Sequence, residues 1–272
     1  MSVAKIMTIA GSDSGGGAGI QADLKTIASL GGYGTSVITA LTAQNTHTVT
    51  QIHEVPVDMI RAQYEAIMED IGADAIKIGM LSSASIIGIV ADLLKKYPAP
   101  HIVIDPVMIS KSGAQLLKDD AIEALKRKLL PLCTLLTPNI PEVEKLVGSP
   151  VSTDEEIQNA AIKLKEQGVR ASLIKGGHLK RANIMNTLYD GNEFHRFTTT
   201  RLKNTYTHGT GCTLSSAIAT YLGQNKPLDQ AVELGIQYVS EGMKNGYVVG
   251  EGANPLNHMH MLERHNLNVK HT

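Results

Sequence analysis

Apolar runs of strand length alternate along the chain with longer segments whose apolar residues recur at helical spacing. The runs predict strands at residues 5–10, 36–43, 75–78, 102–104, 134–136 and 171–174, with an extended piece at 49–55. The longer segments predict helices at residues 19–30, 58–71, 83–96, 119–129, 141–147, 154–167, 212–222 and 228–244. Residues 183–189 and 193–199, joined by Asp190-Gly191-Asn192, predict a β-hairpin. This pattern predicts an α/β fold of three layers, αβα, with a mainly parallel central sheet and the hairpin at one edge.

Glycines and polar residues follow the predicted strands, and open α/β sheets bind their ligands beyond the carboxyl ends of the strands. They form six short stretches: Gly11 to Gly19, Ala43 to Thr46, Gly79 to Leu81, Asp105 to Met108, Thr137 to Glu142, and Lys175 to His178. Turns use the same residue types, so each stretch taken alone is compatible with a simple turn. Their joint appearance at one edge of the sheet predicts a functional site there.

A further stretch, Thr207-His208-Gly209-Thr210-Gly211-Cys212-Thr213, has the composition of a turn that opens onto a helix N-terminus. Backbone N–H groups at such an end have no partner within the helix, and with the helix dipole they favour an anion such as phosphate. The same field favours a thiolate at Cys212, which makes this residue a candidate base or nucleophile. The alternative is a glycine-rich loop whose cysteine is merely buried.

The composition of the chain indicates which binding partners and which cellular compartment to expect. With 272 residues, 43% apolar and 19% charged, the chain fits one large folded domain at residues 1–262 and a polar tail at residues 263–272. The formal net charge of −1 gives no indication of nucleic acid or of an anionic membrane, and no segment has the pattern of a signal peptide or a membrane span. Two cysteines far apart, Cys133 and Cys212, indicate a reducing compartment, so we expect a cytoplasmic protein.

Common nucleotide and metal motifs do not account for the predicted site. The glycine run from Gly15 does not fit G-x-G-x-x-G, because Ile20 stands at the last position, and the sequence contains no Gly-Lys-Ser/Thr triplet. It contains neither H-E-x-x-H nor paired C-x-x-C, and His258-Met259-His260 is more typical of packed or surface histidines than of a metal site. A dinucleotide fold, the usual P-loop and a zinc site are therefore disfavoured.

Taken together, residues 10–23, 39–46, 77–81, 105–108, 136–139 and 208–213 resemble the motifs of hydroxymethylpyrimidine/phosphomethylpyrimidine kinases, the thiamine-biosynthesis branch of the ribokinase-like superfamily. The likeness runs from about Ile6 to about Met261, with the motifs in the family's order and spacing. It implies a ribokinase-like fold, a homodimer, and ATP as the phosphoryl donor. It also implies two successive transfers to 4-amino-5-hydroxymethyl-2-methylpyrimidine, which give the monophosphate and then the diphosphate.

The resemblance also implies which residues serve phosphoryl transfer. Gly209, Thr210 and Gly211 would supply an anion hole for the transferring group, since this chemistry mainly needs positioning and charge neutralisation. Asn139 and Glu142 match the family's N-x-x-E pattern, which supports Mg²⁺ and phosphate, in part through water.

Two further charged residues stand at strand ends. Asp105 could join the Mg²⁺ shell, or serve only as a turn acid before Pro106. Lys175 is expected to face the nucleotide phosphates, or alternatively to extend its ammonium group to solvent. Adenine is expected between the loop after the sixth strand and the last helices, near Val248 or Pro255.

For the pyrimidine, the resemblance points first to Gln44, whose amide offers a donor and an acceptor together and matches a ring nitrogen and an amino group. Asp23 and the backbone at Gly11 are expected at the polar edge of the substrate, with Met80 and Val107 as apolar walls. The alternatives are a first-turn acid favoured by the helix dipole at Asp23 and a core-filling methionine at Met80.

The pyrimidine branch resembled here has cysteine at the position of Cys212, where most ribokinase-like enzymes have aspartate. A thiol starts near pKa ~8.5 and a helix N-terminus can lower that value, so Cys212 could take the proton of the hydroxymethyl group. We expect this role in the first transfer only, because the acceptor of the second is already ionised. His208, four residues before, could lower the thiol's pKa or relay a proton.

Two other functions stay open from the sequence. The arrangement of His208 and Cys212 also resembles a subset of these enzymes that accept pyridoxal, so a pyridoxal or pyridoxine kinase is the first alternative. A non-catalytic sensor that binds the pyrimidine is the second. The intact anion-hole, Asn139 and Glu142 positions argue against a sensor.

Overall fold

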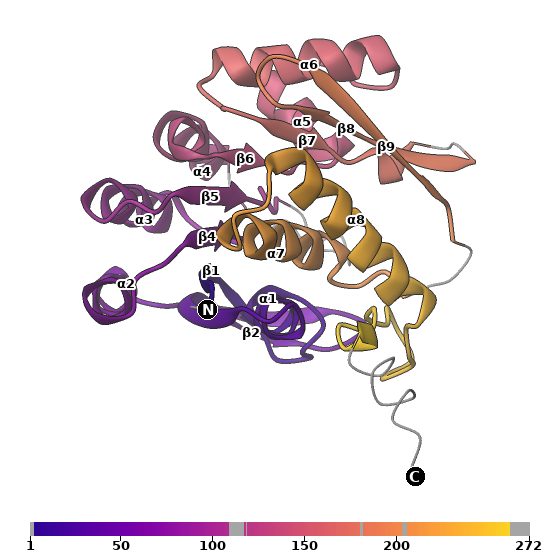
Figure 1. The fold of residues 1–272 in the computed structure, drawn as a ribbon. Helices are drawn as coiled ribbons and strands as arrows, with labels where there is room; N and C mark the ends of the chain where they lie inside the picture. Colours follow the sequence, from indigo (N-terminus) through magenta and orange to yellow (C-terminus); the bar gives the residue numbers. More distant parts are fainter. Residues whose placement is uncertain (1–2, 109–116, 118, 180–181, 203–205, 262–272) are drawn as a thin grey trace.

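The structure, a computed structural model, describes residues 3–108, 117, 119–179, 182–202 and 206–261. Within them one nine-stranded sheet has the order β3-β2-β1-β4-β5-β6-β7-β8-β9 (Figure 1). The strands are β1 (Lys5–Asp13), β2 (Tyr33–Gln44), β3 (Val49–Glu54), β4 (Ala75–Ile78), β5 (His101–Ile104), β6 (Leu135–Leu136), β7 (Ser172–Ile174), β8 (Asn183–Tyr189) and β9 (Phe194–Thr200). The strands from β2 to β7 in this order pair in parallel, while β3 at one edge and the β8–β9 hairpin at the other pair antiparallel.

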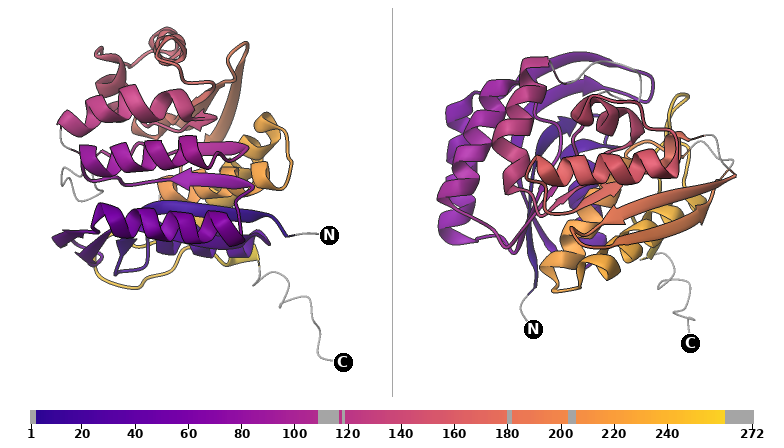
Figure 2. Two further views of the ribbon diagram at one scale, coloured as in Figure 1. Left: turned by 90° about the vertical axis from the view of Figure 1, so that its left-hand side faces the viewer. Right: turned by 90° about the horizontal axis from the view of Figure 1, so that it is seen from above.

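Helices cover both faces of the sheet (Figures 1 and 2). They are α1 (Gly19–Ser29), α2 (Val57–Asp70), α3 (Ala84–Lys96), α4 (Asp119–Ala124), α5 (Ile140–Val147), α6 (Asp154–Glu166), α7 (Thr210–Gly223) and α8 (Leu228–Lys244). One hydrophobic cluster joins the sheet to α2 through α6, and a second joins it to α1, α7 and α8. This is the expected three-layer α/β arrangement. Among the described residues, none of the helices combines the length and hydropathy that a membrane span requires.

The central strands are apolar on both sides because each side meets a helical layer. Ile6 of β1 belongs to the cluster with α7 and α8, and its neighbour Met7 belongs to the cluster on the opposite face. Ala75 and Ile76 of β4 divide in the same way. Successive side chains of a strand point to opposite faces, so an uninterrupted apolar run is what a doubly covered strand requires.

The order of the strands positions the site. The chain moves from β1 to β2 on one side, and then returns to place β4 on the other side of β1. The connections after β1 and β4 therefore diverge, which opens a crevice at the carboxyl ends of these strands.

The bounds of some elements differ from those predicted. β1 extends to Asp13, because its pairing with β2 continues past an irregularity between Ala10 and Ser12. The helix predicted at 119–129 divides into α4 and a π-helical turn, Leu125–Leu129, followed by a 3-10 turn that contains Pro131. Proline has no N–H to continue an α-helical hydrogen-bond ladder. The predicted tail at residues 263–272 lies outside the described residues.

Candidate active site

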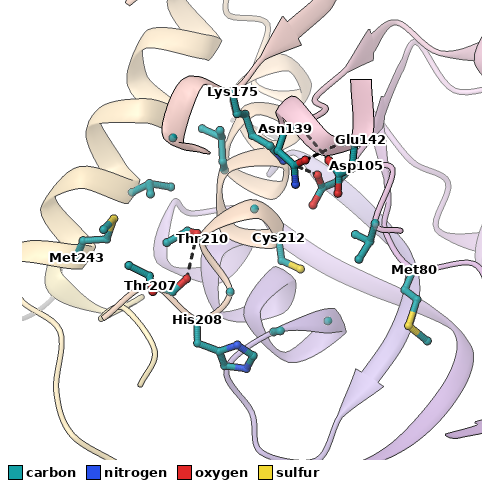
Figure 3. Close-up of a pocket in the computed structure, with 18 of the residues that line it drawn as sticks. Met80, Asp105, Asn139, Glu142, Lys175, Thr207, His208, Thr210, Cys212 and Met243 are labelled. Carbon is teal, nitrogen blue, oxygen red and sulfur yellow. Dashed lines mark hydrogen bonds and ion pairs between the residues drawn. The ribbon is translucent and has the colours of Figure 1, made fainter. Parts of the chain in front are cut away.

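A cavity of about 720 Å³ lies at the carboxyl end of the sheet, and the predicted site residues surround it (Figure 3). All of them except Asp23 line this cavity: Gly11, Gln44, Met80, Asp105, Val107, Asn139, Glu142, Lys175, His208, Gly209, Thr210, Gly211 and Cys212. They come from segments far apart in the sequence. The sheet thus brings the separate strand-end stretches to one place.

The N-terminus of α7 opens into this cavity. Gly209 is the N-cap, with a left-handed φ of 77°, and its carbonyl accepts the N–H of Thr213. The N–H groups of residues 210–212 therefore have no acceptor in the preceding turn of the helix. Because Gly209 has no side chain to occupy this end, the N-terminus is available to an anion. A Cβ on Gly209 would also collide with the carbonyl oxygen of Gly17.

Two acids and a lysine face the same helix end. Lys175 Nζ lies 2.8 Å from Asp105 Oδ1, and a Cβ on Gly211 would lie 3.1 Å from Asp105 Oδ2 and 3.6 Å from Lys175 Nζ. Burial lowers the pKa of Lys175, but Asp105 and Glu142 raise it above its ordinary value, so the ammonium stays charged. It is directed at these carboxylates and not to solvent. This corrects the solvent-facing alternative and makes Lys175 a fixed positive charge beside the N-terminus of α7.

Asn139 and Glu142 form a capping box at the start of α5. The Asn139 side chain accepts the N–H of Glu142 at 3.0 Å, and Glu142 Oε2 accepts the N–H of Asn139 at 2.8 Å. Burial, and then the neighbouring Asp105, raise the pKa of Glu142 to about 7, although Lys175 opposes the shift. The N-x-x-E spacing of Asn139 and Glu142 therefore caps the start of α5 and also places both residues in the cavity wall.

The carboxylates of Asp105 and Glu142 are suited to Mg²⁺. Among the described residues, no group of three or more His, Cys, Asp or Glu side chains is arranged to hold a metal ion. Mg²⁺ does not need such a cage, because it is typically held by one or two carboxylates, waters and substrate phosphates. Since the negative charge of Asp105 raises the pKa of Glu142, a cation near both would be favoured.

Asp23 is placed differently from the prediction. Its carboxylate is fully buried beneath the cavity and accepts hydrogen bonds from Thr8, Lys77 and Ser216. Asp23 therefore does not contact the polar edge of a substrate, and the prediction that it does is wrong. Lys77, which lines the cavity, is missing from the predicted site because it stands within an otherwise apolar strand.

Cys212 lies in the first turn of α7 with its sulfur directed into the cavity (Figure 3). The expectation of a lowered pKa is wrong: burial raises the pKa of the thiol to about 11. The positive charge that opposes this shift is that of Lys77, assisted by the N–H of Gly19. Desolvation of the thiolate outweighs the favourable field at the helix end.

His208 interacts with residues other than Cys212. Its Nε2 lies 3.2 Å from Asp13 Oδ2 and 3.5 Å from Gln44 Nε2. Burial raises the pKa of Asp13, but the hydrogen bonds from His208 and from the N–H groups of Gly15 and Ala18 lower it by more. The net pKa is below the ordinary value, so Asp13 is an anion. The prediction that His208 lowers the pKa of the thiol is therefore not met, since Lys77 has that effect. Asp13, at the end of β1, belongs to the site and is missing from the predicted set.

Gln44 and an apolar wall form another part of the cavity. Thr42 donates a hydrogen bond to Gln44 Oε1 at 3.3 Å, which orients the amide. A Cβ on Gly11 would lie 3.0 Å from the Met80 methyl, so glycine at this position gives Met80 room. Val107 completes the set of residues expected around the pyrimidine.

The expected adenine position stays a prediction. The cavity lining includes the loop after β7, through Gly177 and His178, and the apolar residues Ile236, Val239 and Met243 of α8. Neither Val248, which is 70% exposed, nor Pro255 is among the described residues that line the cavity. The α8 residues have a spacing of three and four, which is typical of one helix face, but the sequence pattern alone does not tell a cavity wall from core packing.

Comparison with known proteins shows to which family the chain is similar. Residues 13–257 match the family model described as phosphomethylpyrimidine kinase. The chain is 46% identical to the hydroxymethylpyrimidine/phosphomethylpyrimidine kinase of Streptomyces coelicolor, covering 93% of each, and 42% identical to that of Bacillus subtilis, covering 99% of each. It is 48% identical to the thiamine biosynthesis bifunctional protein ThiED of Geobacter sulfurreducens, covering 93% of this chain and about half, 52%, of that protein.

Solved structures give a second comparison. A phosphomethylpyrimidine kinase from Clostridium difficile matches with a TM-score of 0.79 and 44% identity, over 88% of this chain and 98% of that one. The ADP complex of Bacillus subtilis pyridoxal kinase matches with a TM-score of 0.89 and 34% identity, over 96% and 99%. Pyridoxal kinase from Staphylococcus aureus, solved with AMP-PCP and pyridoxal, matches with a TM-score of 0.88 and 33% identity, over 95% and 94%.

Proposed function

The chain belongs to the phosphomethylpyrimidine kinase family, and from this premise we propose that it transfers phosphoryl groups from ATP to 4-amino-5-hydroxymethyl-2-methylpyrimidine. Two transfers in succession would give the monophosphate and then the diphosphate used in thiamine biosynthesis. One observation supports this most strongly: the open N-terminus of α7, the thiol of Cys212 and the Gln44 amide line one cavity.

Substrate recognition follows from the cavity wall. The Gln44 amide can donate to a ring nitrogen and accept from the exocyclic amine of an aminopyrimidine. Met80 and Val107 offer apolar surfaces to the two faces of the ring, and the Gly11 backbone lies beside Met80. These contacts would direct the hydroxymethyl group toward Cys212.

In the first transfer, the hydroxymethyl oxygen attacks the γ-phosphorus of ATP, the bond to the β-phosphate oxygen breaks, and ADP leaves. The N–H groups of Thr210, Gly211 and Cys212 would hold the transferring group, and Lys175 would offset its negative charge. The alcohol proton passes to Cys212 Sγ. The second transfer needs no such base, because the acceptor is a phosphate oxygen that is ionised near neutral pH.

Mg²⁺ is part of this proposal. Asp105 and Glu142, with Asn139 through water, would hold the ion beside the nucleotide phosphates. A bound Mg²⁺ supplies charge neutralisation at the phosphate oxygens. Lys175 would remain paired with Asp105 and so keep that carboxylate oriented toward the cavity.

We also propose one catalytic domain at residues 1–262, a homodimer and a cytoplasmic location. A dimer is supported by large apolar side chains exposed around the β3 edge: Leu41, Ile52, Val57 and Met59 are 38–55% exposed. Sedimentation velocity tests this part, and a monomer at micromolar concentration would contradict it. A reducing compartment is supported by Cys133 and Cys212, both free thiols.

Pyridoxal kinase activity is the alternative favoured by a specific observation, because the pyridoxal kinases fit this fold with TM-scores of 0.88 and 0.89. Sequence identity favours the pyrimidine kinases, at 42–48% against 33–34%. The test measures ADP release with the hydroxymethylpyrimidine, its monophosphate and pyridoxal as separate acceptors. Turnover of both pyrimidines is expected. Turnover of pyridoxal without the monophosphate would favour the alternative, and no acceptor-dependent ADP release would favour a sensor.

A further inference from the structure

A charged lysine is enclosed in the middle of the sheet directly beneath the cavity. Lys77 lies in β4, between β1 and β5, and its side chain is fully buried. An unpaired ammonium group in such a place would be strongly disfavoured. Lys77 Nζ lies 2.8 Å from both carboxylate oxygens of Asp23, which is also fully buried. The two residues form a complete ion pair inside the protein.

Both carboxylate oxygens of Asp23 accept two hydrogen bonds each. Besides Lys77, its oxygens accept the hydroxyl of Thr8 at 2.6 Å and that of Ser216 at 2.7 Å. A carboxylate with these four hydrogen bonds is fixed in position. Asp23 therefore holds the ammonium group in one place.

The ion pair is oriented with its positive end toward the cavity. Lys77 lines the cavity, whereas Asp23 does not. Gly79 gives the ammonium space, because a Cβ there would lie 2.9 Å from Lys77 Nζ. Ser216, which donates to Asp23, lies four residues after Cys212 on the same face of α7, so the ion pair lies beside the helix turn that carries the thiol. At this position Lys77 lowers the pKa of the thiol more than Asp23 raises it.

Other charged and polar groups also act on Cys212. Asp105, at the end of β5, raises the pKa of the thiol, and the N–H of Gly19 at the start of α1 lowers it. Lys175 also interacts electrostatically with the thiol. Lys77 is the cation with the largest effect on the sulfur.

We propose that Lys77, braced by Asp23, is a positioning residue that stabilises the thiolate of Cys212 and so enables proton transfer from the hydroxymethyl group in the first phosphoryl transfer. The kinetic part of this inference rests on the proposed function. Stability alone gives little reason for the ion pair, because replacing a buried pair by apolar groups is often neutral or stabilising. An electrostatic role toward the sulfur accounts for a charge at this depth.

The experiment removes both charges together, because removal of one would leave the other unpaired. In Lys77→Met/Asp23→Asn, the asparagine oxygen can accept from one of the two hydroxyls, which bond to different oxygens of Asp23, and the amide N–H can donate to the other hydroxyl oxygen. Should methionine prevent folding, Lys77→Leu/Asp23→Asn is the second variant. The rate of alkylation of Cys212 by iodoacetamide is measured from pH 7.5 to 9.5, and Cys212→Ser gives the background from Cys133.

The double variant removes one charge of each sign, so the shift of the thiol pKa is the difference between the two effects and lies near the lower end of the about 1–3 units that a single nearby charge causes. After allowance for the higher nucleophilicity of a more basic thiolate, alkylation at pH 8 should slow about three- to fourfold. Thr8→Val is the matched control, since it removes a hydrogen bond to Asp23 without changing charge, and should stay within about twofold of the unmodified protein. A folded double variant with unchanged alkylation would overturn the proposal.

Turnover supplies the second readout. The double variant should phosphorylate the alcohol about three- to tenfold more slowly, following its loss of thiolate, and the monophosphate at nearly the original rate. Equal losses in both transfers would indicate a merely structural ion pair. Alkylation needs no turnover, so absence of pyrimidine kinase activity in the unmodified protein would contradict the proposed function and leave the alkylation result intact.

Discussion

Replacing Cys212 with alanine separates proton transfer from phosphate binding. The substitution removes the sulfur but keeps the backbone N–H of residue 212 in the first turn of α7. The first transfer releases the proton of an alcohol, so a base contributes to it. In the second transfer the acceptor phosphate is ionised, with a second pKa near ~6. The variant should therefore lose the first transfer and largely keep the second.

The raised pKa of Cys212 sets the expected magnitude. With a pKa of about 11, about one thiol in a thousand is ionised at pH 8. General bases typically contribute 10²- to 10⁴-fold, and a base so rarely ionised should lie near the lower limit. We therefore expect Cys212→Ala to slow the first transfer about 10²-fold, which corresponds to about 2.7 kcal/mol in activation free energy, and the second less than about threefold.

The pH dependence gives an independent check with a definite sign. Below its pKa, the thiolate fraction rises about tenfold for each unit of pH. The first transfer in the unmodified protein should accelerate accordingly from pH 7 to 9, while the alanine variant should not follow this slope. The assay supplies the alcohol and the monophosphate separately and measures ADP release, with Cys212→Ser as a control of similar size. Equal losses in both transfers, or the same slope in the variant, would refute the reasoning.

Three further substitutions test other parts of the site. Gly209→Ala should abolish both transfers and destabilise the fold by more than about 2 kcal/mol in thermal unfolding, because φ is 77° and its Cβ would meet Gly17. Gly148→Ala, with φ of 70° and open space, is its control and should cost about 1 kcal/mol without loss of turnover. Glu142→Gln should stabilise the protein by up to about 3 kcal/mol at pH 8 and hardly at pH 4. The reason is that a folded-state pKa raised to about 7 makes the ionised carboxylate destabilising above that pH. Equal shifts of the melting temperature at both pH values would contradict this. Gln44→Leu should raise KM for the pyrimidine about 10²-fold by removing two hydrogen bonds, with KM for ATP unchanged; a parallel rise in both would argue against a substrate contact.

The fold could be predicted from the sequence because its signals are local. Apolar runs such as residues 75–78 coincide with β4, and the helix predicted at 228–244 has the bounds of α8. The end of β1 could not be predicted, since residues 11–13 are polar or glycine and join the strand only through pairing with β2. Such pairing depends on residues about thirty positions away.

The candidate site was predictable where a residue stands next to a strand end, as Asp105 and Lys175 do. A site residue could not be predicted where its interaction partner is distant in the sequence. Lys77 has the position of a residue in an apolar strand, and its partner Asp23 stands 54 positions earlier. The pKa of Cys212 shows why the energetics of the site could not be predicted from the sequence. The helix end that favours its thiolate is visible in the sequence, whereas the enclosure that disfavours it is a property of the assembled cavity.

The glycine run after β1 shows why a phosphate loop and a close-packing loop resemble each other in sequence. The N–H groups of Gly15, Gly17 and Ala18 converge on one anion, but that anion is the carboxylate of Asp13. A phosphate cannot use those donors while Asp13 does. A Cβ on Gly17 would collide with the His208 ring, so this glycine instead lets the turn before α7 approach β1. The proposed anion site is therefore at α7, whose N-cap glycine leaves its N–H groups open to the cavity.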